Sequence, residues 1–546
     1  MNTNKLDVLL CNGTVYTMKS KGDTAEAIGF KDGRIAFVGT NKEAEEQESD
    51  QRLDLKGAVV LPGFNDSHMH LYAYCENQTF VDLEKAESIE EVCRLMSERA
   101  RVTPKGTWIR GANFDQGRFA ENRIPDRHDL DRISTEHPIL LHRCCLHAVT
   151  VNSKALSESG LDDSYTPPAG GIAERDADGH LTGIFKEDAV KMFDDIIPAP
   201  LSDPAVRDKM MREAIEKLHS EGLTGIHTYA ERLGKYADHI EFYQDLEKKG
   251  ELGVRVALSR LDLFDKENIT EEAHNDPHRL VQQGSYKLFT DGSLGSRSAA
   301  LLEDYSDDPG NNGFLVCTQE ELNEKVLTAY RRGLQPAVHA IGDRGVDSAL
   351  ASFEYALNAE RVAGIADEEL RKRLPFRLIH AQILNDSLIE RMKKLPLLVD
   401  IQPVFLNTDW LWVKDRIGEA RNNGAYAWNT LHNAGLRLAG GSDCPVEQFN
   451  PIYGIYTAVA RKGLNGQPAG GYRPEEAMDR FDAAALYTTN AHYATGQQDV
   501  LGILEPGRFA DAVVLDRDIF TVPEEDILRT KVTHTFVAGK LVYGTL

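Results

Sequence analysis

The segment VVLPGFNDSHMH, residues 59–70, joins an apolar strand pattern to a His-x-His pair. We expect Val59–Asn65 to form a β-strand because apolar residues dominate it. In an extended chain, side chains two residues apart point to one side, so His68 and His70 can address one point. Neutral imidazole is the commonest metal ligand of this kind. Because His-x-His pairs also occur as exposed or hydrogen-bonded histidines, a metal site here needs partners elsewhere in the chain.

Further strand-like segments follow this one, and helical patterns such as Arg207–Glu221 and Leu322–Gly333 separate most of them. The segments are Thr224–Tyr229, Gly253–Ser259, Ser285–Thr290, Gln335–Ala340, Phe376–His380, Leu397–Gln402 and Leu436–Gly441. With the first strand they make eight units in series, which favours a closed barrel over an open sheet of about six strands. We therefore predict an α/β fold, a (β/α)8 TIM-type barrel spanning residues 61–489.

The spacing of the predicted strands is uneven after the first one. The stretch from Leu71 to about Ser202 is too long for one crossover helix and holds Gly- and Pro-rich turns such as residues 166–171. Loops of that length are seldom without structure of their own. We predict an inserted subdomain at residues 72–205 that lies over the active site and influences substrate choice.

Both ends of the chain are rich in strand patterns. Asp7–Met18 and Ala25–Val38 are apolar and β-branched, and the second contains a hairpin turn at Lys31–Arg34. Residues 510–515 and 532–542 have the same character. We predict one composite β-sandwich from residues 1–60 and 490–546. The alternative is two independent β appendages.

Composition limits the classes of partner. The chain has 546 residues and a formal net charge of −24, which argues against nucleic acid or an anionic membrane as the main partner. The chain has seven cysteines, an odd number, and no Cys-x-x-Cys pair. This pattern indicates a reducing compartment, so we expect a cytoplasmic protein.

No apolar run approaches the roughly 20 residues that span a bilayer. We expect a small-molecule substrate and, as the commonest assembly, a homodimer.

Residues able to bind metal also occur on other predicted strands. Lys287 lies in the fourth strand, His339 and His380 end the fifth and sixth, and Asp443 follows the eighth. Each alone is more often a satisfied polar group or a solvated side chain. In a barrel, however, the C-terminal ends of all strands meet at one face, where the active site lies. We therefore predict that these residues join His68 and His70 in one metal site.

The chain resembles the amidohydrolase superfamily, in the branch that includes N-substituted formamide deformylase. The resemblance covers nearly the whole chain and depends on long motifs. They are LPGFNDSHMH at 61–70, KLFTDGSLGSR at 287–297, VHAIGD at 338–343, GSDCPV at 441–446 and EPGRFAD at 505–511. The resemblance implies the barrel, the composite sandwich and the metal centre, but no particular substrate.

The resemblance to the amidohydrolase superfamily also implies a role for each predicted metal ligand. His68, His70 and Asp443 would hold one divalent metal ion, and His339 and His380 a second. Lys287 would bridge the two as a carbamate formed with CO2, because a free ammonium has no lone pair. Zinc suits this set, with manganese or iron as substitutes. A metal-bound hydroxide would attack a non-peptide C–N bond of amide or formamide type, with Asp443 as the proton carrier.

Five other residues are candidates for substrate binding: His147, Arg297, Trp108, Asp115 and Gln402. For Trp108 a place in the core, and for Arg297 an ion pair, are equally good interpretations. His147 resembles a family position in the subdomain that caps the site.

Two other functions remain open. A mononuclear deaminase on the same fold would carry a glutamate shortly after the fifth-strand histidine, whereas Ala340, Ile341, Gly342 and Asp343 follow His339. A catalytically inactive regulatory protein on this fold would be free to lose ligands, and this chain has all six. Both comparisons favour an amide hydrolase.

Overall fold

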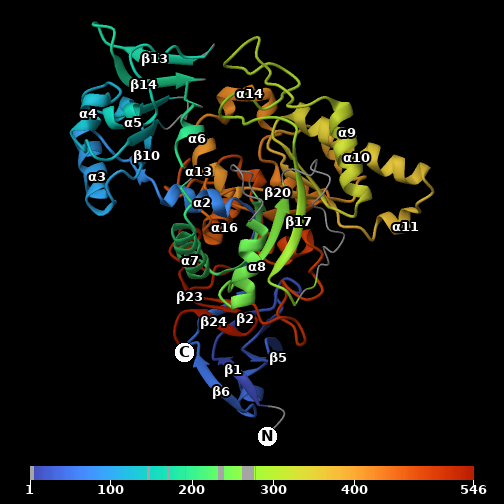
Figure 1. Cartoon of the computed structure of the whole chain (residues 1–546). Helices are drawn as coiled ribbons and strands as arrows, with labels where there is room; N and C mark the ends of the chain where they lie inside the picture. The colour runs from blue at the N-terminus through green and yellow to red at the C-terminus, as the bar shows by residue number, and fades with distance from the viewer. Residues whose placement is uncertain are drawn as a thin grey trace. The chain divides into compact units, whose positions relative to one another are not determined.

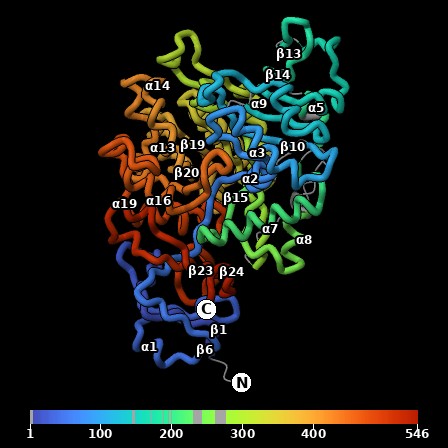
Figure 2. Tube along the Cα trace, turned by 90° about the vertical axis from the view of Figure 1, so that its left-hand side faces the viewer, coloured from blue at the N-terminus to red at the C-terminus, as the bar shows by residue number. Residues whose placement is uncertain are grey.

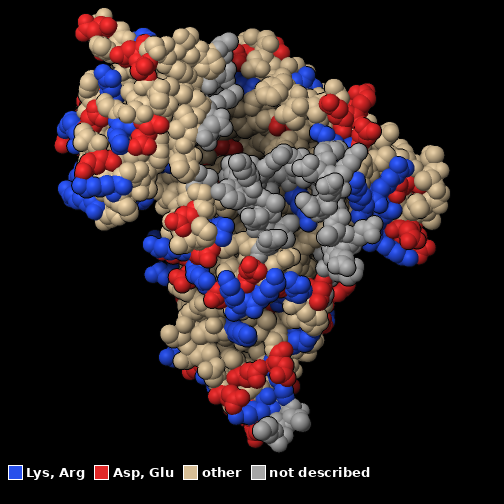
Figure 3. Space-filling view, in the orientation of Figure 1, with Lys and Arg blue, Asp and Glu red and all other residues tan. Residues whose placement is uncertain are grey.

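The structure is a computed structural model that describes residues 5–143, 148–168, 171–187, 189–190, 192–198, 200–230, 239–260, 276 and 278–546. The chain divides into two compact units, Met1–Leu71 with Glu213–Leu546, and Tyr72–Arg212. No helix among the described residues is both long and apolar enough to traverse a bilayer. Acidic and basic side chains are intermingled over the face drawn in Figure 3.

The larger unit is built around an eight-stranded sheet in the order β21-β20-β19-β18-β17-β16-β15-β8, with every neighbouring pair parallel. Its strands are β8 Phe64–Met69, β15 Leu223–Ala230, β16 Arg255–Arg260, β17 Val281–Phe289, β18 Pro336–Ala340, β19 Phe376–His380, β20 Leu397–Ile401 and β21 Arg437–Gly440. Helices α8 (His239–Lys249) and α10 (Asp343–Val362) lie outside these strands (Figure 1). The predicted TIM-type barrel is confirmed.

Helix α9 (Gln319–Arg331) shows how one of the helices between the barrel strands begins and packs. Thr318 and Glu321 form a capping box, which satisfies two exposed N–H groups at the start. Leu322, Val326, Ala329 and Tyr330 recur at helical spacing and are buried. Such a stripe packs a helix against the strands, whose two faces are then both covered.

The predicted first barrel strand, Val59–Asn65, is wrong in its bounds. The chain changes sheets at Gly63: β7 (Val59–Pro62) pairs with terminal strands, and β8 begins at Phe64. A Cβ on Gly63 would lie 2.3 Å from Thr224, so only glycine allows this close approach. Both strands are buried, and the apolar run of the sequence continues from Val59 across Gly63 to Phe64, which is why the sequence indicates one strand.

Strands from both ends of the chain share one sheet, in the order β24-β23-β22-β7-β2-β3. Besides β7, its members are β2 Thr14–Tyr16, β3 Thr24–Ala25, β22 Ala512–Leu515, β23 Val532–Val537 and β24 Lys540–Tyr543. A second sheet, β5-β4-β1-β6, consists of β1 Leu6–Cys11, β4 Ala27–Lys31, β5 Arg34–Gly39 and β6 Ser49–Asp54. One buried cluster draws on both sheets, among others Ile28, Phe30, Val60, Val514 and Phe536. Figure 2 shows β23 and β24 beside the N-terminal strands.

The smaller unit has its own sheet, β13-β14-β12-β11-β10-β9. The strands are β9 Val81–Asp82, β10 Ile109–Phe114, β11 Ile139–Arg143, β12 Ala148–Val151, β13 Gly171–Arg175 and β14 Leu181–Glu187. Helix α3 (Ile89–Val102) begins at the N-cap Ser88 and buries Ile89, Val92, Cys93 and Met96, at helical spacing. These side chains join one buried cluster with Leu141, so the unit carries a core of its own.

Candidate metal centre

The end of β8 and the loop after β21 are held side by side by backbone hydrogen bonds. The N–H of Asp443 donates to the carbonyl of His68 at 2.7 Å, and the N–H of His70 donates to the carbonyl of Cys444 at 2.7 Å. The buried Asp66 carboxylate adds to this link, because it accepts the N–H groups of His68 at 2.9 Å and Ser442 at 3.1 Å. These bonds join the first and last strands of the barrel at its C-terminal face.

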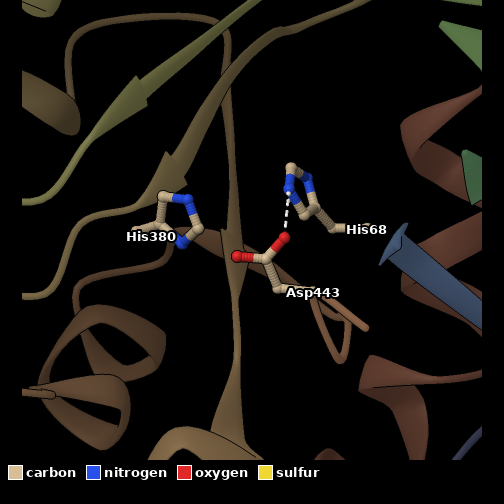
Figure 4. A group of neighbouring side chains, drawn as sticks. All are labelled: His68, His380 and Asp443. Atoms are coloured by element: carbon tan, nitrogen blue, oxygen red, sulfur yellow. Dashed lines mark ion pairs between the residues drawn. The ribbon is translucent and has the colours of Figure 1, made fainter. Parts of the chain in front are cut away.

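This link brings a carboxylate to the His-x-His pair. Oδ1 of Asp443 lies 3.2 Å from Nε2 of His68 and 3.1 Å from Nε2 of His70. His68, His380 and Asp443 each offer an atom within 4.8 Å of the others (Figure 4). Such a spacing allows a single ion to contact all three.

Neighbouring groups fix the orientation of three imidazoles. Nδ1–H of His380 donates to Oε1 of Gln402 at 2.7 Å, and Nε2–H of His339 donates to the carbonyl of Gly292 at 3.1 Å. Nδ1 of His68 shares a hydrogen bond of 2.6 Å with the hydroxyl of Tyr229. In His380 and His339 the second ring nitrogen is then free of its proton and has a lone pair for a metal.

Lys287 is buried among these groups, with 2% of the residue exposed. Its Nζ lies 3.5 Å from Nε2 of His68, and 4.9 and 5.0 Å from the ring centroids of Tyr229 and Phe289. Burial lowers the pKa of this amine to about 7, which leaves a large neutral fraction near neutral pH. Its surroundings are therefore those of a reactive amine and differ from those of a solvated lysine.

The protonation states of the candidate ligands are those that can bind a cation. Burial lowers the pKa of His380 to about 3 and holds the pKa values of His68 and His339 well below the usual range, so these rings are neutral. Burial alone would raise the pKa of Asp443, but its contacts with His68 and His70 hold that pKa below its usual value. Neutral imidazoles and an ionised carboxylate are the forms that bind metal.

The backbone is strained where two of these groups are attached. His380 has φ of 77° and Asp443 has φ of 55°, both in the left-handed region that non-glycine residues rarely adopt. Residues held in such regions cluster at functional sites, because the surrounding structure must stabilise them.

All six predicted ligands lie in one connected group. The ring centroid of His380 is 5.5 Å from that of His68 and 4.5 Å from that of His339. His70, Asp443 and Lys287 join the group through the distances given above. Four imidazoles and one carboxylate are nitrogen and oxygen donors of the kind that divalent ions bind, so the residues present fit a divalent ion.

The substrate-binding candidates have structural partners where they are described. Gln402 is buried and accepts the hydrogen bond from His380. Arg297 pairs with Asp307 at 2.9 Å. In the smaller unit, Trp108 packs against a buried apolar cluster, and Asp115 pairs with Arg143 at 3.5 Å. His147 lies outside the described residues.

Two groups beside the ligands were missed in the sequence. Tyr229 ends β15 and contacts both His68 and His70, with ring centroids 4.8 and 4.9 Å away, yet a lone tyrosine at a strand end has no distinctive pattern. Asp66 lies on β8 two residues before the His-x-His motif, and this place next to two ligands is the available signal.

Three comparisons with known proteins bear on this site. The model of a family described as the amidohydrolase family matches residues 51–543. The chain is 34% identical to a putative amidohydrolase, YtcJ, of Bacillus subtilis, over 97% of this chain and 98% of that protein. It is 28% identical to an N-substituted formamide deformylase of Arthrobacter pascens, over 99% of each. The crystal structure of an uncharacterized metal-dependent hydrolase from Pyrococcus horikoshii is similar with a TM-score of 0.77 and 30% identity, covering 95% of this chain and 99% of that one.

Proposed function

The chain belongs to the amidohydrolase family, and from this premise we propose that it is a metal-dependent hydrolase that cleaves an amide or formamide-type C–N bond other than a peptide bond. The observation that carries the proposal is the convergence of His68, His380 and Asp443 within 4.8 Å. A scaffold protein would have no need to bury three such groups against one another.

We assign the ligands as follows. His68, His70 and Asp443 would hold one ion, His339 and His380 a second, and a carbamate on Lys287 would bridge them. Zinc is our preferred metal, with manganese or iron as substitutes. Divalent ions in such sites supply Lewis-acid activation of water and of the substrate carbonyl.

Asp443 is the proposed proton carrier. Its carboxylate lies within 3.2 Å of two imidazoles and is held ionised by them. It would accept the proton of the attacking water and return it to the nitrogen of the departing amine, so that the C–N bond breaks with a neutral leaving group.

Lys287 is the proposed site of carboxylation. Its neutral amine can attack CO2 and lose a proton, which leaves an anionic carbamate with two oxygen donors. The position of Nζ, 3.5 Å from Nε2 of His68, would place that carbamate among the ligands. The alternative to a carbamate is a lysine in an ion pair, for which Asp291 is the nearby carboxylate in the sequence, beside a single metal. The Asp291 carboxylate instead accepts N–H groups from Ala300 at 2.9 Å, Ile341 at 3.1 Å and Gly342 at 2.9 Å.

Several expectations from the sequence stay predictions. Residues 72–205 are proposed to lie over the barrel mouth and to select the substrate. The proposed substrate contacts are His147, Trp108 and Asp115 in this segment and Arg297 and Gln402 outside it. The two terminal sheets are proposed to form a composite β-sandwich. A cytoplasmic location and a homodimer also stay predictions.

The proposed role of residues 72–205 in substrate selection can be tested at His147. His147→Ala should change KM or the ranking of substrates more than it changes metal content. Unchanged KM and ranking would remove His147 from the substrate site.

The test is a hydrolysis screen of N-formyl and N-acyl amines with the zinc-loaded protein, read by release of the amine and the acid. We expect turnover of at least one compound and none with metal-free protein. Release of ammonia from aminated nucleobases, without amide hydrolysis, would instead support a deaminase. Neither activity, in a protein that also fails to bind stoichiometric zinc, would support the regulatory alternative.

A further inference from the structure

A fully buried ion pair lies inside the barrel next to the candidate ligands. Arg377 on β19 and Asp400 on β20 form two hydrogen bonds, Nε to Oδ2 at 2.8 Å and Nη2 to Oδ1 at 2.8 Å, and both side chains are 0% exposed. Arg377 precedes His380 on the same strand, and Asp400 precedes Gln402. The pair therefore occupies the interior on the N-terminal side of the ligands.

The same guanidinium reaches the strand that carries His-x-His. Nη2 of Arg377 donates to the carbonyl of Ser67 at 2.7 Å, and this carbonyl belongs to the peptide that joins Ser67 to His68. Strand β8 pairs with β15, whereas β19 pairs with β18 and β20. The hydrogen bond thus crosses the barrel interior between strands that are not neighbours.

Strand β20 supports ligands on two other strands. Oε1 of Gln402 holds the ring of His380 directly. Asp400, two residues earlier and on the same side of the strand, holds Arg377 and through it the backbone before His68. Both histidines of the three-residue metal cluster therefore depend on β20 for their placement.

Stability alone does not explain such a pair. Removing two charges from water costs about as much as their attraction returns, and an apolar pair of similar volume is often as stable. The planar guanidinium of an arginine also provides several N–H donors in a fixed geometry, which an apolar pair lacks.

We infer that Arg377 and Asp400 are positioning residues that set the distance between β8 and β19, and so the spacing of His68 and His380 within the proposed metal centre. This inference depends on the proposed metal function. The pair touches neither substrate nor metal in this account. Groups that orient metal ligands from outside typically change metal affinity by about 10–100-fold when removed.

The test uses the full chain and a matched control. Arg377→Met with Asp400→Asn removes both charges together, because either change alone would leave an uncompensated buried charge. The control is Arg255→Met with Asp511→Asn, which removes a second buried pair with bonds of 2.7 and 3.0 Å that lies between β16 and the start of β22. Zinc affinity is measured by competition with a chromophoric chelator, the visible spectrum after cobalt(II) substitution reports ligand geometry, and thermal unfolding reports the fold.

We expect the Arg377/Asp400 double variant to unfold cooperatively, to bind zinc about 10–100-fold more weakly and to show a shifted cobalt spectrum. The control should lose stability with zinc affinity unchanged. Arg377→Lys keeps the positive charge but lacks the planar guanidinium, so it should weaken zinc binding as the double variant does. If the double variant does not fold, the zinc affinity of Arg377→Lys tests the inference. Wild-type zinc affinity and cobalt spectrum in a folded Arg377 variant, or equal losses in the control, would overturn the inference. A wild-type protein that binds neither metal would overturn the proposed function itself.

Discussion

Oδ1 of Asp443 lies 3.2 Å from Nε2 of His68, although the two residues come from the last and first strands of the barrel. The contact follows from the backbone, since the N–H of Asp443 donates to the carbonyl of His68 at 2.7 Å. The contacts that close the barrel therefore also assemble the site. A substitution that disturbs these contacts should alter the geometry of the site as well.

Substitution of Asp443 by Asn should lower kcat by more than about a hundredfold, because the amide cannot carry a proton between water and the leaving amine. The side chain keeps its size, so the fold should persist. Steady-state kinetics and a thermal unfolding curve check both statements. A folded variant with wild-type kcat would remove Asp443 from the mechanism.

Substitution of Lys287 by Ala should remove metal and most activity, because the bridging carbamate can no longer form. Added short carboxylic acids should partly restore both by supplying the missing oxygens. Metal analysis and, for the wild type, carbon-13 NMR after growth with labelled bicarbonate provide the measurements. Full metal content in Lys287→Ala, together with an unmodified lysine in the wild type, would contradict the carbamate.

Substitution of Tyr229 by Phe removes the hydroxyl that shares a 2.6 Å hydrogen bond with Nδ1 of His68. Losing this orienting contact should weaken zinc binding by about tenfold or more, with little change in stability. Tyr472→Phe is the matched control, because its hydroxyl donates to Asn422, which is no candidate ligand. Equal zinc affinities in the two variants would show that the Tyr229 hydroxyl has no such role.

Asp409, at the end of α13 (Leu406–Asp409), should make stability depend on pH. Burial raises the pKa of its carboxyl to about 6 from the usual 3.8, with a hydrogen bond from Tyr426 opposing the shift. The folded chain then keeps a proton that the unfolded chain releases, so this stabilisation is lost as pH rises through about 6.

Asn at position 409 imitates the protonated form at every pH. Between about pH 4 and pH 6 the melting temperature of the wild type should therefore fall relative to that of Asp409→Asn, because only the wild type must ionise a desolvated carboxyl. A difference that stays constant over this interval would show that Asp409 does not titrate there.

Much of the site could be predicted because its chemistry is concentrated at strand ends. Lys287, His339 and His380 each interrupt or end an apolar run, and a parallel barrel brings such ends to one face. The change of sheet at Gly63 could not be predicted, since the apolar run of the sequence continues across it from Val59 to Phe64 and both strands are buried. Only the approach of Thr224, from a distant part of the chain, requires the glycine.

The buried support of the ligands was harder to predict for another reason. Arg377 and Asp400 are single charges inside the apolar runs FRLIH and LLVDI, and a charge in such a run must find a partner. The sequence therefore shows that each needs a partner but does not show which one. Tyr229 has no such signal, because a buried tyrosine is ordinary in a core.

The central claim is that catalysis depends on a divalent metal held by these six residues. The most direct measurement is the rate of amine release from a substrate found in the screen, before and after dialysis against a chelator and again after zinc or manganese is added. We expect turnover to be lost when the metal is removed and to return when metal is added back. Full turnover by protein that metal analysis shows to be metal-free would contradict it.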